Sequence, residues 1–199
     1  LGDHYAEDQL YFSINYSVFD NQTSQIENSG FSYALSAGFM KDVILNKQGS
    51  ISFALGVGYG FDYFNQNLKV EQINNVTSFD VFQEGESGFF RSQNIEIPFE
   101  LRWRTSNAKL YKYWRIYAGI KFLYNTSNEF ITETSDVQES FKNVSAYNDF
   151  QYGLTLSVGY DLFNLNVFYG LTDVFEEASF NNQNLDTRIL KFGLIFYIL

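Results

Sequence analysis

Cysteine is absent from this chain of 199 residues, which excludes disulfide bonds, thiolate catalysis and cysteine-ligated metal sites. Proline occurs only once, at Pro98, as is typical of long paired strands, because proline cannot donate a hydrogen bond to a neighbouring strand. No stretch of about 18 apolar residues is present, so the sequence predicts no transmembrane helix. These absences favour a protein built from strands.

Basic residues are also scarce. Lys and Arg together number 13 against 23 Asp and Glu, which gives a net charge of -10. Nucleic acid is therefore excluded as a partner, because its phosphates require a basic surface.

Aromatic side chains, in contrast, are abundant. They make up 20% of the chain, with 22 Phe and 15 Tyr, whereas the mean hydropathy is -0.20. A membrane β-barrel has this combination, because one face of each strand meets lipid and the other face is polar.

The clearest pattern lies between residues 95 and 121. Apolar and polar side chains alternate there in two runs joined by a polar turn, from Ile95 to Arg104 and from Trp114 to Lys121. Because successive side chains of a strand point to opposite faces, this pattern predicts a hairpin with one apolar and one charged face. In a soluble protein the apolar face would form the core. Both tryptophans lie on that face, however, as in the aromatic girdle of a lipid-facing sheet.

The same alternation recurs along the chain and predicts about eight antiparallel strands. We place them at residues 9–19, 30–40, 50–64, two strands within 93–125, 147–160, 164–171 and 185–199. Long acidic links at residues 65–92, 126–146 and 172–184 are expected to be loops, whereas the links on the other side are shorter, including residues 41–49 and 105–112.

This asymmetry predicts the fold class: one all-β domain, an eight-stranded antiparallel transmembrane barrel with short periplasmic turns and longer acidic extracellular loops. Residues 1–8 would be a periplasmic segment and residues 9–199 the barrel. An even strand number puts both termini in the periplasm, and we expect the signal peptide to have been removed. A soluble lipocalin-like barrel would instead hold its apolar side chains inside.

Gly56, Gly58 and Gly60 share the inner face of one predicted strand. They would let neighbouring interior side chains approach closely. A phosphate-binding loop is excluded, because no turn and helix follow these glycines.

Charged residues on the inner face form the first candidate site. We expect Glu96, Glu100, Arg102, Arg104, Arg115, Lys121 and Lys191 inside the barrel. They would form either an ion or proton path or a plug of mutually neutralising charges, and the narrow interior of eight strands favours the plug.

Other candidate residues lie on the surface. We expect a membrane-interface girdle of Trp103, Trp114, Tyr59, Tyr63 and Tyr160. The acidic loops could bind calcium, but no EF-hand spacing is present, and a solvated acidic surface is the simpler interpretation. We expect no catalytic, cofactor or metal site, because the single histidine, His4, precedes the first strand and faces no substrate.

The last strand carries a further pattern. Lys191, Gly193, Phe196 and Ile198 are similar to the C-terminal insertion signal of bacterial outer-membrane barrels, which implies the barrel-assembly machinery as a partner during insertion.

Two stretches, ELRWRTS at residues 100–106 and WRIYAGIK at residues 114–121, together with the remaining strands, resemble the PorT family of Bacteroidetes, called SprT in gliding relatives. The resemblance implies a non-enzymatic outer-membrane component of type IX protein secretion and gliding, in contact with the translocon or other secretion components and with outer-membrane lipid or lipopolysaccharide. The alternative is a surface-binding or adhesion barrel that acts through its extracellular loops.

Overall fold

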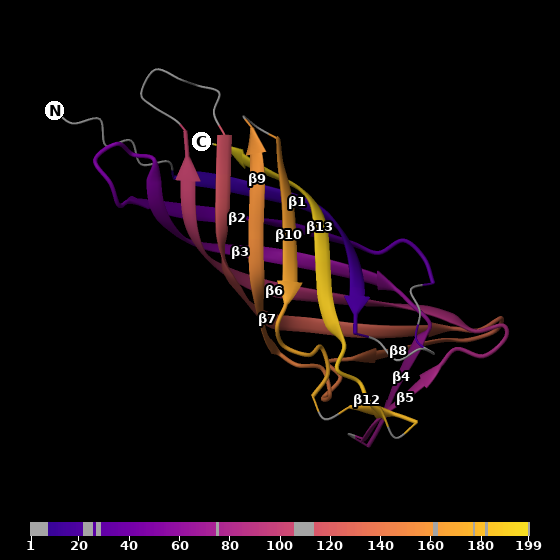
Figure 1. Ribbon diagram of the computed structural model, residues 1–199. Coiled ribbons are helices and arrows are strands. Elements are labelled where there is room, and N and C mark those ends of the chain that lie inside the picture. Colours follow the sequence, from indigo (N-terminus) through magenta and orange to yellow (C-terminus); the bar gives the residue numbers. More distant parts are fainter. Residues whose placement is uncertain are drawn as a thin grey trace.

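The structure is a computed structural model that describes residues 8–21, 26, 29–74, 76–105, 114–160, 163–176, 178–181 and 183–198. Eight antiparallel strands form a closed barrel (Figure 1). They are β1 (Gln9–Asp20), β2 (Tyr33–Ile44), β3 (Ile51–Asn65), β6 (Ser87–Arg104), β7 (Trp114–Glu133), β9 (Phe150–Tyr160), β10 (Phe163–Gly170) and β13 (Arg188–Ile198). The pairing of β6 with β7 closes the ring, which confirms the predicted fold class. Within the described residues, no helix is long and apolar enough to cross a bilayer.

The strands are strongly tilted. When paired residues are followed once around the barrel from Arg115, the path returns to β7 at Asn125, ten residues farther along the strand. A stagger of this size over eight strands corresponds to a tilt of roughly 40°. The segment of β7 between Trp114 and Tyr124 therefore rises by about 25 Å, the height of the apolar band of outer-membrane barrels.

The alternation predicted from the sequence is confirmed in the barrel strands. In β1, for example, Leu10 is 59% exposed on the outer face, whereas its neighbour Tyr11 is 4% exposed inside. Large apolar side chains cover the outer face of the other barrel strands in the same way.

The long acidic links are not simple loops, and on this point the prediction from sequence was wrong. Residues 65–92 contain the hairpin β4 (Leu68–Ile73) and β5 (Val76–Val81) and the beginning of β6. In residues 126–146, β7 continues to Glu133 and turns back as β8 (Gln138–Lys142). Residues 172–184 include the short pair β11 (Ser179–Phe180) and β12 (Gln183–Asn184).

These elements form a cap over one end of the barrel, opposite the end where β1 begins and β13 finishes (Figure 1). We use the word cap for β4, β5, β8, β11, β12, the extensions of β6 and β7, and the described segments that connect them. Seventeen buried apolar side chains join the cap to the adjacent end of the barrel: Phe19, Ile26, Phe64, Leu68, Val70, Phe90, Leu123, Phe130, Val144, Tyr147, Phe168, Val174, Phe175, Ala178, Phe180, Leu185 and Ile189.

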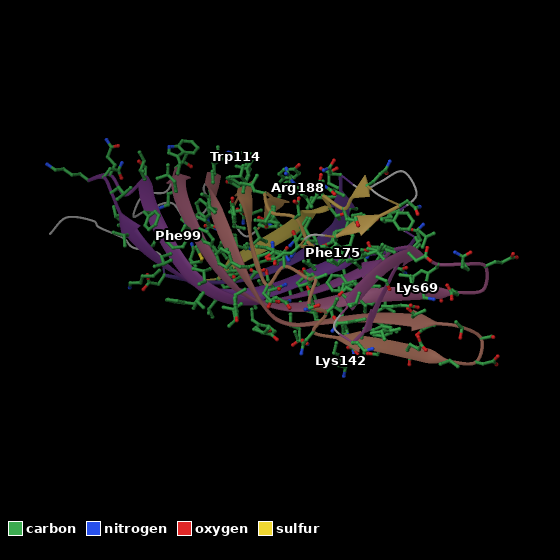
Figure 2. The ribbon with its side chains drawn as sticks, turned by 90° about the horizontal axis from the view of Figure 1, so that it is seen from below. Lys69, Phe99, Trp114, Lys142, Phe175 and Arg188 are labelled. Carbon is green, nitrogen blue, oxygen red and sulfur yellow. The ribbon has the colours of Figure 1, made fainter. Side chains whose placement is uncertain are left out.

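A row of stacked phenylalanines lies at the centre of this cluster. The ring centroids are 4.2 Å apart for Phe19 and Phe64, 5.7 Å for Phe64 and Phe90, and 4.3 Å for Phe90 and Phe130. These rings come from β1, β3, β6 and β7, so the row extends across the mouth of the barrel from several strands. The cap therefore closes this end of the barrel with packed apolar side chains. Phe175, in the segment between β10 and β11, contributes to this packing (Figure 2).

Candidate functional site

The seven charged residues expected inside the barrel all occupy inward positions. Each is between 0 and 9% exposed. The set consists of Glu96, Glu100, Arg102 and Arg104 on β6, Arg115 and Lys121 on β7, and Lys191 on β13. They are distributed over two levels of the interior.

The first level lies at the end where β1 begins. Asp42 on β2 accepts hydrogen bonds from two guanidinium groups, with Arg102 Nη1 at 3.2 Å and Arg104 Nη1 at 3.0 Å. Arg102 also donates from Nε to Glu100 at 3.0 Å and from Nη1 to Gln9 at 3.1 Å. With these side chains almost fully buried, the network blocks the lumen at this level.

Two tyrosine rings complete this level. The Arg102 guanidinium lies 4.5 Å from the ring centroid of Tyr117 and 5.4 Å from that of Tyr197, and the two rings meet edge to face. A desolvated guanidinium over an aromatic face is stabilised by the ring quadrupole. Arg102 is thus held by charge on one side and by aromatic faces on the other.

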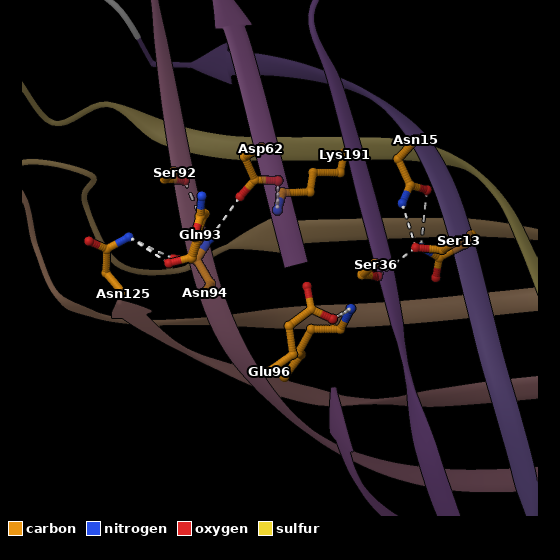
Figure 3. Close-up of polar contacts among 12 residues, drawn as sticks. Ser13, Asn15, Ser36, Asp62, Ser92, Gln93, Asn94, Glu96, Asn125 and Lys191 are labelled. Carbon is orange, nitrogen blue, oxygen red and sulfur yellow. Dashed lines mark hydrogen bonds and ion pairs between the residues drawn. The ribbon is translucent and has the colours of Figure 1, made fainter. Parts of the chain in front are cut away.

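The second level lies nearer the cap and contains separate ion pairs (Figure 3). Lys121 Nζ is 2.9 Å from Glu96, which also accepts a hydrogen bond from the Tyr11 hydroxyl at 3.2 Å. Lys191 Nζ is 2.6 Å from Asp62, and Asn94 donates to the other oxygen of that carboxylate at 3.0 Å. The arrangement neutralises charges pairwise, between the neighbouring strands β6 and β7 for Glu96 and Lys121, and between the distant strands β3 and β13 for Asp62 and Lys191.

Glycines make room for this level. A Cβ atom on Gly58 would lie 2.0 Å from the Tyr11 hydroxyl oxygen, and one on Gly60 would lie 2.6 Å from a carboxylate oxygen of Glu96. Gly38 is in the same position relative to the Tyr11 ring, at 2.5 Å. The missing side chains of these glycines therefore leave the space that Tyr11 and Glu96 occupy. The sequence predicted such a close approach for the glycines of β3.

A small cavity lies in the described part of the interior. A cavity of about 10 Å³ lies between the two levels, lined by residues that include Tyr11, Glu100, Lys121 and Tyr197. This is about the space that one water molecule requires. This cavity thus has no room for a substrate or a permeating solute.

Four of the five expected girdle residues lie at two opposite heights of the outer face. Trp103, Trp114 and Tyr160 lie near the end away from the cap, where the rings of Trp114 and Tyr160 are 5.5 Å apart. Tyr63 lies at the cap side, with its ring centroid 5.2 Å from Tyr33 and 5.1 Å from Phe89. Tyr59 lies on the same strand but farther from the cap, and its hydroxyl donates a hydrogen bond to Gln93 at 2.6 Å.

The residues of the C-terminal pattern divide between the two faces of β13. Lys191 points inward, as described above. A Cβ atom on Gly193 would lie 2.2 Å from the backbone oxygen of Ile14 on the neighbouring β1. Phe196 and Ile198 belong to the outer face, where Phe196 meets Phe163 edge to face.

The cap carries a different electrostatic pattern. Each basic residue that the structure describes in the cap, and Arg188 at the adjoining start of β13, has an acidic partner: Lys69 with Glu71 and Glu86, Arg91 and Lys142 with Glu129, and Arg188 with Asp173. Eight further acids there have no ion pair with a described base, namely Asp80, Glu84, Glu133, Asp136, Glu139, Asp149, Glu176 and Asp186. The surface of the cap is therefore acidic.

The pKa values of two cap carboxyl groups follow from their contacts. Burial raises the pKa of Glu129, but hydrogen bonds from Ser140 and Arg91 outweigh that effect, so its pKa is lowered below 4.5. The pKa of Glu86 is lowered by a hydrogen bond from the backbone of Gln83 and by Lys69. Among the described residues, no group of three or more His, Asp or Glu is placed to hold a metal ion. His4 lies outside the described residues.

A comparison with protein families assigns the chain. Residues 3–176 match the model of the outer membrane protein beta-barrel domain, which is most of the chain. The chain belongs to this family. A search of curated proteins found no match. The barrel is therefore an outer-membrane barrel, and its apolar outer face is the face that meets lipid.

Sequence reasoning missed Asp42 as an interior residue and did not single out Asp62. Asp62 already belongs to the inward set of the third predicted strand. Asp42 falls in residues 41–49, which we interpreted as a link, whereas β2 continues to Ile44. The signal was present, because the inward positions Gly38, Met40 and Asp42 continue the period of two.

Proposed function

We propose that this outer-membrane barrel is a non-enzymatic accessory component of type IX protein secretion and works by contact with other proteins. The observation that supports the proposal best is the closed lumen. Two buried polar levels fill the interior and a hydrophobic cap covers one end, so a role by contact is simpler than a role in transport. The resemblance of residues 100–106 and 114–121 to the PorT family supplies the link to secretion.

The absence of catalysis is part of the same proposal. The interior acids that the structure describes are each paired with a base or hydrogen-bonded, and the cavity between the two levels has space for about one water molecule. General acid–base or nucleophilic chemistry needs a group within reach of its substrate. We therefore propose structural contacts as the whole of its activity.

The lipid-facing surface and the turns at the end away from the cap are the proposed contact sites with the translocon. The turn between β2 and β3 suits such a role because it is well ordered: Arg104 Nε donates to the backbone oxygen of Gly49 at 2.9 Å, and Asn46 bonds both Ser50 and the backbone N–H of Ile51. Leu45 is 59% exposed beside this turn. We propose the short link at residues 105–112 as a second contact; all of it but Thr105 lies outside the described residues.

The proposal includes an orientation. Leu10 pairs with Ile198, so β1 begins where β13 ends, and the proposal places this end in the periplasm with the acidic cap at the cell surface. Removal of a signal peptide, contact with lipopolysaccharide and insertion by the barrel-assembly machinery belong to this proposed route.

A surface-binding or adhesion barrel is the second candidate. The acidic cap favours it, because a folded and charged extracellular surface is what such a protein would present to its ligand. The two candidates are separable. Replacement of the cap hairpins by short turns would abolish adhesion, whereas a translocon component with membrane or periplasmic contacts would continue to work.

The decisive experiment for secretion is deletion of the gene, with a plasmid copy as control, followed by measurement of type IX cargo in the culture medium. We expect cargo to disappear from the medium and to accumulate in the periplasm. Normal export in the deletion strain would contradict the secretion proposal and leave the adhesion candidate.

A further inference from the structure

We propose that the free edge of β8 in the cap binds an extended, cationic segment of another protein at the cell surface, as an added β-strand. The site is independent of the lipid-facing and periplasmic contacts proposed above. Its recognition chemistry is that of a sheet edge, whose N–H and C=O groups match the backbone of an extended peptide.

The first argument is topological. β8 is the last strand in its sheet: it pairs with β7 on one side, and no strand of the described chain is hydrogen-bonded to its other edge. Above the level of Tyr124, where β7 stops pairing with β9, β8 takes the position beside β7. The hairpin projects beyond the barrel (Figure 1), about 20 Å above the lipid-facing band by the rise of a tilted strand.

The second argument concerns which backbone groups face the open edge. Thr134 N–H donates to the backbone oxygen of Val137, and Asn143 N–H donates to that of Asn128. These two bonds lie at the two ends of the β7–β8 ladder and fix its alternation, because hydrogen-bonded and non-hydrogen-bonded pairs alternate in antiparallel strands. The residues opposite Glu133, Ile131 and Glu129 are therefore non-hydrogen-bonded to β7. They are Gln138, Ser140 and Lys142.

These three residues direct their N–H and C=O groups away from β7, toward the open edge. All three are exposed. Natural edges are protected by proline, bulges, cover or charge. β8 contains no proline and its pairing with β7 has no register shift, and the ammonium of Lys142 lies 3.7 Å from Glu129. A row of three outward residues is thus open to a partner strand.

The third argument is charge complementarity. Glu133, Asp136 and Glu139 surround this edge and have no ion pair with a described base, whereas the one base of the hairpin, Lys142, is already paired. An acidic edge attracts a cationic strand and repels an anionic one. Exposed Val137, at the tip of the hairpin, adds an apolar contact for such a strand.

The chain offers a matched pair of variants for the test. Ser140→Pro removes the outward N–H but leaves the ladder to β7 intact, since that N–H is not part of it. Ser140→Ala keeps the N–H. Both variants lose the hydrogen bond from the Ser140 hydroxyl to Glu129, so they differ in the edge donor and not in that contact.

The probe is a fluorescent short peptide of alternating lysine and valine, titrated by anisotropy against the full-length barrel in nanodiscs. The same peptide with alternate backbone nitrogens methylated, and a glutamate–valine analogue, are the comparison probes. We expect the Lys–Val peptide to bind the parent and Ser140→Ala equally and Ser140→Pro about tenfold more weakly, with neither comparison probe binding well. Hydrogen exchange should show the bound peptide protecting the amides of Gln138, Ser140 and Lys142.

Three outcomes would overturn the proposal. Equal binding to Ser140→Pro, with exchange at Thr132 confirming an intact ladder, would mean that the edge is not used. Equal binding of the methylated peptide would reduce the effect to nonspecific attraction. Association of the barrel with a second copy of itself at β8, in place of the peptide, would identify another occupant. None of these results bears on the export of type IX cargo, so the two proposals fail separately.

Discussion

At the scale of single residues, the packing of the interior depends on glycines of β2 and β3 as much as on the charges. Tyr11 can donate to Glu96 only because Gly38 and Gly58 leave space for its ring. We expect Gly58→Ala to lower the free energy of unfolding by about 1–3 kcal/mol, the usual cost of overpacking. Urea unfolding of the folded barrel in lipid measures this. The double variant with Tyr11→Phe should recover part of the loss, because the closest clash involves the hydroxyl, and a fully stable Gly58→Ala would show that Tyr11 lies elsewhere.

Asp42 is the centre of the first charged level, since it accepts hydrogen bonds from both Arg102 and Arg104. Asp42→Asn would leave two buried guanidinium groups short of negative charge. We expect the same urea measurement to show a loss of about 3–5 kcal/mol, as for a buried ion pair that loses one member. Asp80→Asn, which removes an exposed cap acid, is the control and should change stability little. Equal effects of the two substitutions would argue against a special role of Asp42.

At the scale of elements, the β7–β8 hairpin should respond to acid. The pKa of Glu129 in the folded chain is lowered below 4.5, so the ionised carboxylate stabilises the hairpin above that value and the contribution is lost as the pH falls through the lowered pKa. Hydrogen exchange at Phe130 and Phe141, corrected for intrinsic rates, should therefore show easier opening as the pH falls through this lowered pKa. Glu129→Gln should remove this pH dependence, and an unchanged dependence would assign it to another group.

The elements also show where sequence reasoning succeeds and where it stops. Barrel strands such as Gln9–Asp20 and Ile51–Asn65 were predictable to within a few residues, because lipid on one side and a filled lumen on the other impose a strict period of two. The β4–β5 hairpin was missed. Its sequences LKVEQI and VTSFDV alternate only weakly, and Leu68, Val70 and Phe79 become a buried face only through rings from other parts of the chain. Such tertiary packing is invisible in the local pattern.

The candidate site was predictable to a similar extent. The inward set of charges followed from alternation, but their pairing did not, because Asp62 and Lys191 are 129 positions apart and meet only once the ring is closed. The conformation of the cap likewise could not be read from its acidic composition. It depends on seventeen apolar residues dispersed among polar ones.

At the scale of the whole molecule, the lumen is closed in two independent ways, by the cap and by the two charged levels inside the barrel. Replacement of residues 67–86 by a short turn would remove the β4–β5 hairpin from the cap but leave both charged levels in place. We expect this variant, like the parent, to show no open-channel conductance in planar bilayers, because eight strands leave an interior only wide enough for side chains. Steady conductance of the variant alone would show that the cap is the real barrier, and conductance of the parent would contradict the closed lumen itself.

The position of Lys191 has a consequence for how the barrel is made. It is the ion-pair partner of Asp62, and it is carried by β13, which comes after the other seven barrel strands in the chain. Until β13 joins β1, an incomplete sheet holds a carboxylate with no counter-ion beside it, and in a hydrocarbon environment such a charge is expensive. A chain that ends before β13 would therefore keep Asp62 without its ion-pair partner. Only a chain that includes β13 can insert into the bilayer with this interior charge neutralised.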